Sequence, residues 1–270
     1  MVKKISLLAV FVCTLALLMI VSSSGAAFGA NASDSTQVVV PRGQAVEIAF
    51  ADDLTGFASG FGVNLANVVQ MAVSAQPSIR GFPIQINLVD TPCGDPTADV
   101  AAATTIVANT QNVGVLGQLC SQGFDQVLPI YESADLVTIT GSATNDSLPS
   151  FAPSVFNRTA VDDGDGFDSW YAMVTQLPSD LAWQQMYSLQ FGMAPTAFGD
   201  LYYDAASLLI RDVQRTSSID DSGNLVVNRA AVASAVRSTT KFQGVTCTIT
   251  LDPATGNRID DPTRLSRCAG

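Results

Sequence analysis

The sequence contains no histidine among its 270 residues, and this absence excludes several kinds of catalytic site. Without an imidazole, the chain cannot form a Ser-His-Asp or Cys-His site or bind a metal through histidine. Basic residues are also scarce. The chain has 13 Lys and Arg and 24 Asp and Glu, which gives a formal net charge of −11. Such a charge repels phosphate backbones, so we expect no nucleic-acid partner. We also expect no metal and no cofactor.

The N-terminus combines a charged start, an apolar middle and an exit of mainly small residues. Lys3 and Lys4 precede an apolar run at 5–21, and small residues predominate at 22–30. This order is typical of a secretory signal peptide, which we assign to residues 1–30. An uncleaved membrane anchor is the alternative, because the run is about long enough to span a bilayer. Either way, we expect the rest of the chain to be exported, to the periplasm or the outer cell surface.

Four of the five cysteines lie beyond this leader: Cys93, Cys120, Cys247 and Cys268. An even number in an exported chain predicts two disulfides, although the count alone allows three pairings. Pairing between nearest neighbours would close two short loops, Cys93 with Cys120 and Cys247 with Cys268. Oxidised cysteines offer no thiolate nucleophile, so with histidine also absent we do not expect an enzyme.

From Val46 onward, short β-branched segments alternate with longer segments of helical spacing. This alternation predicts an α/β protein with a doubly wound parallel sheet. Ligands of such sheets bind in the loops beyond the carboxyl ends of the strands. We predict strands at 46–50, 83–89, 113–117 and 136–140, helices at 60–74, 97–108 and 124–134, and candidate ligand loops at 52–62, 90–96, 118–123 and 140–145.

The alternation fails between 153 and 193. The acidic segment 162–166 does not match the spacing of a calcium loop and is expected to be a solvated linker. Beyond it we predict helices at 196–213 and 229–237, a strand at 225–227 and an extended piece at 245–251. Adjacent acidic pairs are interpreted as solvated turns; they are Asp52/Asp53, Asp162/Asp163, Asp220/Asp221 and Asp260/Asp261.

Several motifs at the predicted strand ends are similar to those of one known family. They are Ala-Asp-Asp-Leu-Thr-Gly at 51–56, Val-Asp-Thr-Pro-Cys-Gly-Asp-Pro at 89–96, Gly-Gln-Leu-Cys-Ser at 117–121, Thr-Gly-Ser-Ala-Thr-Asn at 140–145 and Val-Phe-Asn-Arg-Thr at 155–159. Together they resemble the periplasmic leucine/isoleucine/valine-binding proteins, the type I solute-binding proteins of ABC importers. Tyr-Asp-Ala at 203–205 and Phe-Gln-Gly at 242–244 resemble the segment that returns to the first lobe of this fold.

The resemblance implies a Cys93–Cys120 disulfide and a set of ligand-binding residues. The hydroxyl of Ser121, and the hydroxyl and amide of Thr144, would hold the α-carboxylate of an amino acid. The carbonyl of Ser142 would accept from the α-amino group, and Phe61 would stand where relatives often have an aromatic residue. The full candidate set is Ser121, Ser142, Ala143, Thr144 and Phe61.

The resemblance also implies that part of the fold is missing. Relatives carry a complete second lobe between the Arg-Thr and Tyr-Asp-Ala motifs, where this chain has only a short interval. We expect a first lobe at 38–158, a shortened remnant at 159–195 in place of the second lobe, and a returning segment with a disulfide-closed tail at 196–270. Without second-lobe groups to close over a charged ligand, binding is expected to be weak or absent.

These observations predict an extracytoplasmic binding protein that captures a branched-chain or similar small amino acid or amide. Its partner would be the membrane permease of an ABC importer. The alternative is a sensory or protein-interaction module built on a single lobe, because loss of a lobe could expose an apolar surface.

Overall fold

The computed structural model describes residues 36–160 and 180–259. The expected leader at 1–30, the acidic segment 162–166 and Cys268 lie outside these residues. Among the described helices, none is both long enough and apolar enough to cross a bilayer.

A six-stranded sheet lies at the centre of the described chain, in the order β3-β4-β2-β5-β6-β7. Four of its neighbouring strand pairs are parallel, and only the short edge strand β3 pairs antiparallel, with β4. The predicted α/β fold with a parallel sheet is therefore confirmed. The strands are β2 (Val46–Asp52), β3 (Ser78–Ile79), β4 (Phe82–Asp90), β5 (Asn112–Gly117), β6 (Thr138–Thr140) and β7 (Phe156–Arg158).

The two central strands explain why the sheet forms. All six residues of β5 are buried, and β2 is buried at every position except Glu47, which is half-buried. A strand covered by helices on both faces requires apolar side chains pointing both ways, which the β-branched runs supply. β4 is partly open instead, and Leu88 there is 57% exposed.

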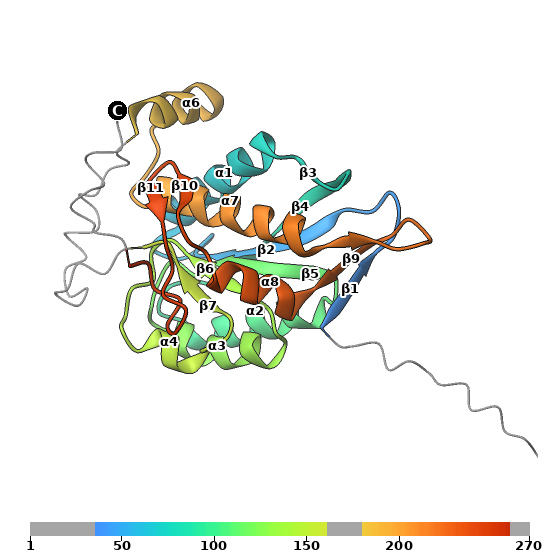
Figure 1. The fold of residues 1–270 in the computed structure, drawn as a ribbon. Helices are drawn as coiled ribbons and strands as arrows, with labels where there is room; N and C mark the ends of the chain where they lie inside the picture. Colours follow the sequence, from blue (N-terminus) through green and yellow to red (C-terminus); the bar gives the residue numbers. More distant parts are fainter. Residues whose placement is uncertain (1–35, 161–179, 260–270) are drawn as a thin grey trace, which may run out of the picture. The chain divides into compact units, whose positions relative to one another are not determined.

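Helices cover both faces of the sheet (Figure 1). α1 (Ser59–Ala75) and α7 (Gly199–Thr216) lie on one face, and α2 (Pro96–Ala108) and α3 (Phe124–Ser133) lie on the other. One side of α1 is apolar and buried, including Leu65 and Val69. In α3 the buried side chains are Phe124, Val127, Leu128 and Tyr131, whereas Ile130 is only half-buried.

The remaining elements come mainly from the second half of the chain. One three-stranded antiparallel sheet and one hairpin form, and α8 occupies the range that the sequence predicts. These elements are β1 (Gln37–Val40), β8 (Ser218–Ile219), β9 (Leu225–Asn228), β10 (Phe242–Gly244), β11 (Cys247–Ile249), α4 (Leu148–Phe151), α6 (Leu181–Phe191) and α8 (Arg229–Arg237).

α7 begins three residues later than the sequence predicts. Thr196 donates its backbone amide to Asn64 Oδ1 on α1, at 3.1 Å, and Phe198 adopts a left-handed conformation with φ of 66°. Both features hold this stretch outside the helix. The tertiary contact with Asn64 therefore overrides the helical spacing that begins at 196 in the sequence.

Candidate functional site

Four loops follow the carboxyl ends of β2, β4, β5 and β6, as the sequence predicts. The order of the strands reverses between β2 and β5, and α1 and α3, which follow these two strands, lie on opposite faces of the sheet. Such a reversal is where ligands of open α/β sheets usually bind. At this point Gly117 lies so close to the Ala51 carbonyl oxygen that a Cβ atom would collide with it, and its φ of 120° also favours glycine.

The first loop is organised by a buried carboxylate, that of Asp53. It accepts hydrogen bonds from the backbone amides of Gly56 (2.6 Å) and Ala58 (3.1 Å) within its own loop. It also accepts from the amide of Cys93 (3.1 Å) in the loop after β4. Asp53 therefore fixes the shape of one ligand loop and joins it to the next.

Asp90, at the end of β4, makes the reciprocal connection. Its carboxylate accepts from the backbone amides of Leu54 (2.8 Å) and Thr55 (3.2 Å), and also from the Thr55 hydroxyl. Carboxylates that accept several N–H groups form some of the stronger hydrogen bonds in proteins. The two acids therefore hold the first two loops in one arrangement.

The interpretation of Asp52/Asp53 as a solvated turn is wrong, because both side chains are 0% exposed. Asp52 ends β2 and Asp53 follows it; both face the interior, and Asp53 also binds a group from another segment, the Cys93 amide. Asp220, by contrast, does lie in an open turn and accepts from the amides of Ser222 and Asn224. The other two acidic pairs lie outside the described residues.

Replacing Asp53 with alanine is expected to lower the free energy of unfolding by about 2 kcal/mol, because three backbone N–H groups lose a charged acceptor. Urea denaturation at neutral pH measures this change. Asp220→Ala is the matched control, since it also removes a carboxylate bound to backbone amides but in an exposed turn, where water can replace it. Equal losses in the two variants would show that the buried connection adds nothing.

A disulfide joins the second loop to the third. Cys93 and Cys120 are bonded, with Cα atoms 5.7 Å apart, which confirms the first predicted pairing. The second predicted pairing involves Cys268, beyond the described residues, so the Cys247–Cys268 disulfide stays a prediction. With the Asp53 and Asp90 connections, the Cys93–Cys120 bond links three consecutive candidate ligand loops.

Ser121 joins the third loop to the fourth. Its Oγ accepts from the backbone amides of Thr144 (3.0 Å) and Asn145 (3.2 Å). A hydroxyl has two acceptor positions and one donor hydrogen. These two amides fill the acceptor positions, so the Ser121 O–H remains able to donate to an added acceptor. A carboxylate oxygen is the kind of group that it suits.

Ser142 has the opposite orientation, toward the interior. Its hydroxyl donates to the Leu119 carbonyl oxygen at 2.9 Å and lies 3.1 Å from the Tyr202 hydroxyl. Thr140 Oγ1 accepts from the Ser142 amide at 3.1 Å, which holds the turn in place. The Ser142 hydroxyl therefore forms its hydrogen bonds within the protein interior.

Asp52 lies behind this turn and is linked to it through the Tyr202 hydroxyl. Burial raises the pKa of Asp52 to about 7, and the nearby Asp53 charge adds to the increase. Hydrogen bonds from the Asp53 amide (2.8 Å) and from Tyr202 act in the opposite direction. The site thus rests on a carboxyl group that changes charge near neutral pH.

A second carboxyl group, Asp99 in the first turn of α2, is buried beside the third loop. A Cβ atom on Gly123 would collide with its Oδ2 atom, so the helix α2 and the start of α3 meet here. Burial is the main cause that raises the pKa of Asp99 to about 7. The negative charges of Asp95, Asp53 and Asp90 raise it further. Asp99 therefore lies among several other acidic groups of the first two loops and the start of α2.

The structure brings four of the five predicted site residues together. Ser121 follows β5, and Ser142, Ala143 and Thr144 follow the adjacent strand β6. Ala143 and Thr144 are buried. Phe61 stands on a different element, the first turn of α1, where it is half-buried and packs against the core.

Gln118 is a residue that the sequence did not single out. Both polar atoms of its side chain are buried, and neither has a hydrogen-bond partner in the part of the chain that the structure describes. Buried polar groups are nearly always paired, with protein, water or ligand. The residue follows β5 directly, at the strand reversal. Only its place in the 118–123 loop indicated a role beforehand.

Neither a protein-family model nor a curated protein matches the chain. Solved structures do. The leucine-binding protein LivK from Thermotoga maritima has a TM-score of 0.64 at 15% identity, covering 80% of this chain and 93% of that one. LivJ from Streptococcus pneumoniae, solved with isoleucine, has a TM-score of 0.63 at 13% identity, with 80% and 94% covered. A solute-binding protein from Rhodopseudomonas palustris, solved with 3,4-dihydroxybenzoic acid, has a TM-score of 0.64 at 10% identity, with 80% and 91% covered.

These neighbours are substrate-binding proteins of ABC transporters, some for branched-chain amino acids and one with an aromatic acid. The chain therefore has the fold of the type I periplasmic binding proteins. At these identities the likeness establishes the fold, and the ligand has to be argued from the side chains.

Proposed function

We propose that this chain is an exported binding protein that captures a small amino acid for an ABC importer. The observation that carries the proposal is the position of Ser121. Its hydroxyl bridges the third and fourth ligand loops and keeps its hydrogen for an external acceptor. The fold supports the proposal because the site lies where such sheets bind ligands.

The α-carboxylate of the amino acid is the group that this position suits. It would accept from the Ser121 hydroxyl and lie near the N-terminus of α3, which begins at Phe124 and favours negative charge. The Thr144 amide donates to Ser121 Oγ in this structure, so it would reach the ligand by sharing or exchanging that bond. Gln118 offers a further amide.

The α-amino group would bind the carbonyl of Ser142, and Phe61 would line the ligand's side chain. Ser142 suits this role because its hydroxyl is engaged elsewhere and its backbone is held by Thr140. Ala143, between Ser142 and Thr144, would present backbone only. These assignments favour a branched-chain or similar small amino acid or amide.

We further propose that 38–158 and 196–270 form one lobe and that 159–195 replaces a second lobe. The described residues hold one parallel sheet, and α7 packs against β5 and β6 of that sheet. Because a ligand held by one lobe keeps much of its charge unpaired, we expect a dissociation constant of about 0.1–1 mM. The permease of the importer would be the protein partner.

Isothermal titration calorimetry tests this proposal with leucine, isoleucine, valine, small amides and 3,4-dihydroxybenzoate. At least one amino acid should bind, and Ser121→Ala should weaken it about tenfold, because a carboxylate loses its donor. Ser133→Ala is the matched control: it removes an exposed hydroxyl at the far end of α3, bonded only to the Ile130 carbonyl at 2.8 Å, and should change nothing. The proposal would be contradicted if no ligand bound, or if Ser121→Ala bound the amino acid as tightly as the natural protein does.

A further inference from the structure

Helix α6 presents an unusual surface for an acidic protein. Residues 181–199 contain no charged side chain, although the whole chain has a formal net charge of −11. Leu181 is 71% exposed and Leu189 is 87% exposed, so large apolar groups face water on this helix. Like charges oppose the approach of two copies elsewhere on the surface, and this helix is a place where that repulsion is weak.

The opposite face of α6 anchors it to the protein. Trp183 stacks on Tyr187 with ring centroids 5.9 Å apart and meets Tyr203 edge-on at the same distance. The Tyr187 hydroxyl donates to the Asn64 carbonyl oxygen on α1, at 3.2 Å. The Asp180 carboxylate caps the start of the helix. The exposed face is therefore carried on a well-anchored helix.

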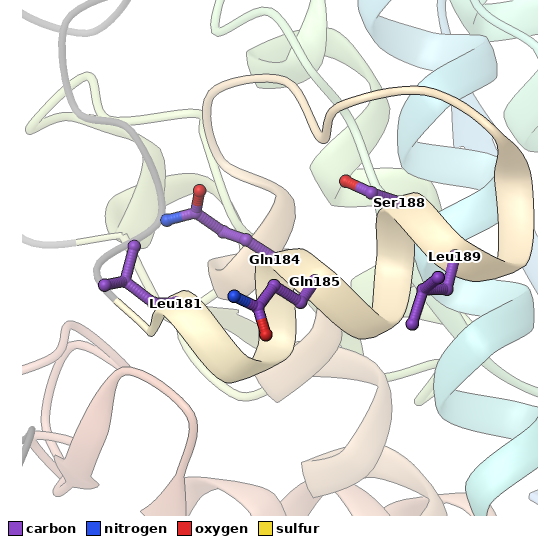
Figure 2. A pocket seen from close by; sticks show the side chains of 5 residues that line it. All are labelled: Leu181, Gln184, Gln185, Ser188 and Leu189. Atoms are coloured by element: carbon purple, nitrogen blue, oxygen red, sulfur yellow. The ribbon is translucent and has the colours of Figure 1, made fainter.

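Five side chains on one side of α6 form a stripe, here called the α6 stripe: Leu181, Gln185 and Leu189 are exposed, and Gln184 and Ser188 are half-buried. Figure 2 shows Leu181 near one end of the helix, Leu189 near the other, and the three polar residues between them. They line an open groove of about 530 Å³. Spacings of three and four residues place them on one side of a helix.

We propose that the α6 stripe is a homodimer contact, in which α6 of one copy packs antiparallel on α6 of a second copy. A two-fold axis through Gln185 sets Leu181 of each copy against Leu189 of the other. The Gln185 amides of the two copies then meet at the centre, where each can both donate and accept hydrogen bonds. A surface that is apolar at both ends and uncharged throughout is complementary to itself, as an isologous interface requires.

One helix from each copy is a small interface, so the dimer is weak, with a dissociation constant of about 10–100 µM. Sedimentation velocity of the full chain over about 1–500 µM measures it. Leu189→Glu adds like charges at both ends of the contact and should weaken dimerisation at least about tenfold. Leu88→Glu is the matched control, since Leu88 on β4 is also exposed, at 57%, and should leave the dimer unchanged.

A pair of variants at the proposed axis tests the geometry. Gln185→Glu and Gln185→Lys each set like charges together and should dimerise less than the natural protein. A 1:1 mixture of the two should recover dimers, because opposite charges then meet. A monomer at every concentration, an association that Leu189→Glu leaves intact or Leu88→Glu also abolishes, or a mixture that gains nothing would each overturn the proposal. None of these results depends on ligand binding.

Discussion

Raising the pH from 5 to 8 should lower the free energy of unfolding by about 5 kcal/mol, at about 1.4 kcal/mol per pKa unit and per group. Burial raises the pKa of both Asp52 and Asp99 from 3.8 to about 7. The folded state therefore keeps these protons at a pH where the unfolded chain has lost them. Their stabilising contribution is complete below pH 4 and is lost as the pH rises to about 7. Asp204, whose pKa burial raises to about 6, acts in the same direction over a lower range.

The double variant Asp52→Asn, Asp99→Asn should lose much less stability over this range, because an amide does not ionise. Urea denaturation at pH 5, 6, 7 and 8 measures both slopes. Asp220→Asn is the control: hydrogen bonds from Asn224 lower the pKa of Asp220, so its contribution is lost as the pH falls below 4, and the slope above pH 5 should not change. A natural protein that is more stable at pH 8 than at pH 5 would refute this account of the buried acids.

Opening the Cys93–Cys120 disulfide should cost about 3.5 kcal/mol of stability. The bond closes a loop with a sequence separation of 27, and the chain-entropy relation for a loop of that length gives this value. Urea denaturation of the double variant Cys93→Ser, Cys120→Ser measures the loss. Ligand binding should weaken as well, because the bond positions the loop that carries Ser121.

The comparison variant for the disulfide is Cys247→Ser with Cys268→Ser, which tests the second predicted pairing on its own. If that pairing forms, this variant loses stability while the Cys93–Cys120 bond and ligand binding remain. Unchanged stability in the Cys93→Ser, Cys120→Ser variant would mean that the three loops keep their arrangement without the covalent link.

Strong local patterns made much of the fold predictable. β2 and β5 are nearly uniform apolar runs, and α8 ends where its spacing ends. β7 was not predicted as a strand because its short segment includes the polar Asn157 and Arg158, whose burial depends in part on partners far away in the sequence. Arg237, for example, donates to Asn157 Oδ1 at 3.0 Å across 80 residues.

α6 was also only partly indicated by its sequence. Apolar side chains occur on its buried face, at Trp183 and Tyr187, and on its exposed face, at Leu181 and Leu189. A helix with apolar residues on opposite sides lacks the one-sided periodicity that identifies an amphipathic helix. The property that obscured the helix is the same one that suggests a contact surface.

The candidate site residues come from motifs that the resemblance supplied, whereas the contacts between remote residues that shape the loops were not predicted. Ser121 and Thr144 fall within the motifs that carry the resemblance. In the structure the Thr144 backbone nitrogen lies 3.0 Å from Ser121 Oγ. Asp53 looks like half of a turn in the sequence, because its partner Cys93 is 40 residues away. No local pattern distinguishes a buried carboxylate that joins two loops from a solvated one.

The most direct test of the central claim is an amide chemical-shift titration of the isotope-labelled protein with leucine, isoleucine and valine. If the hydroxyl-bearing turns form the amino-acid site, the largest shifts should fall at residues 118–124 and 141–145, with Thr144 among them. Shifts confined to other parts of the protein, or none at millimolar ligand, would contradict the account.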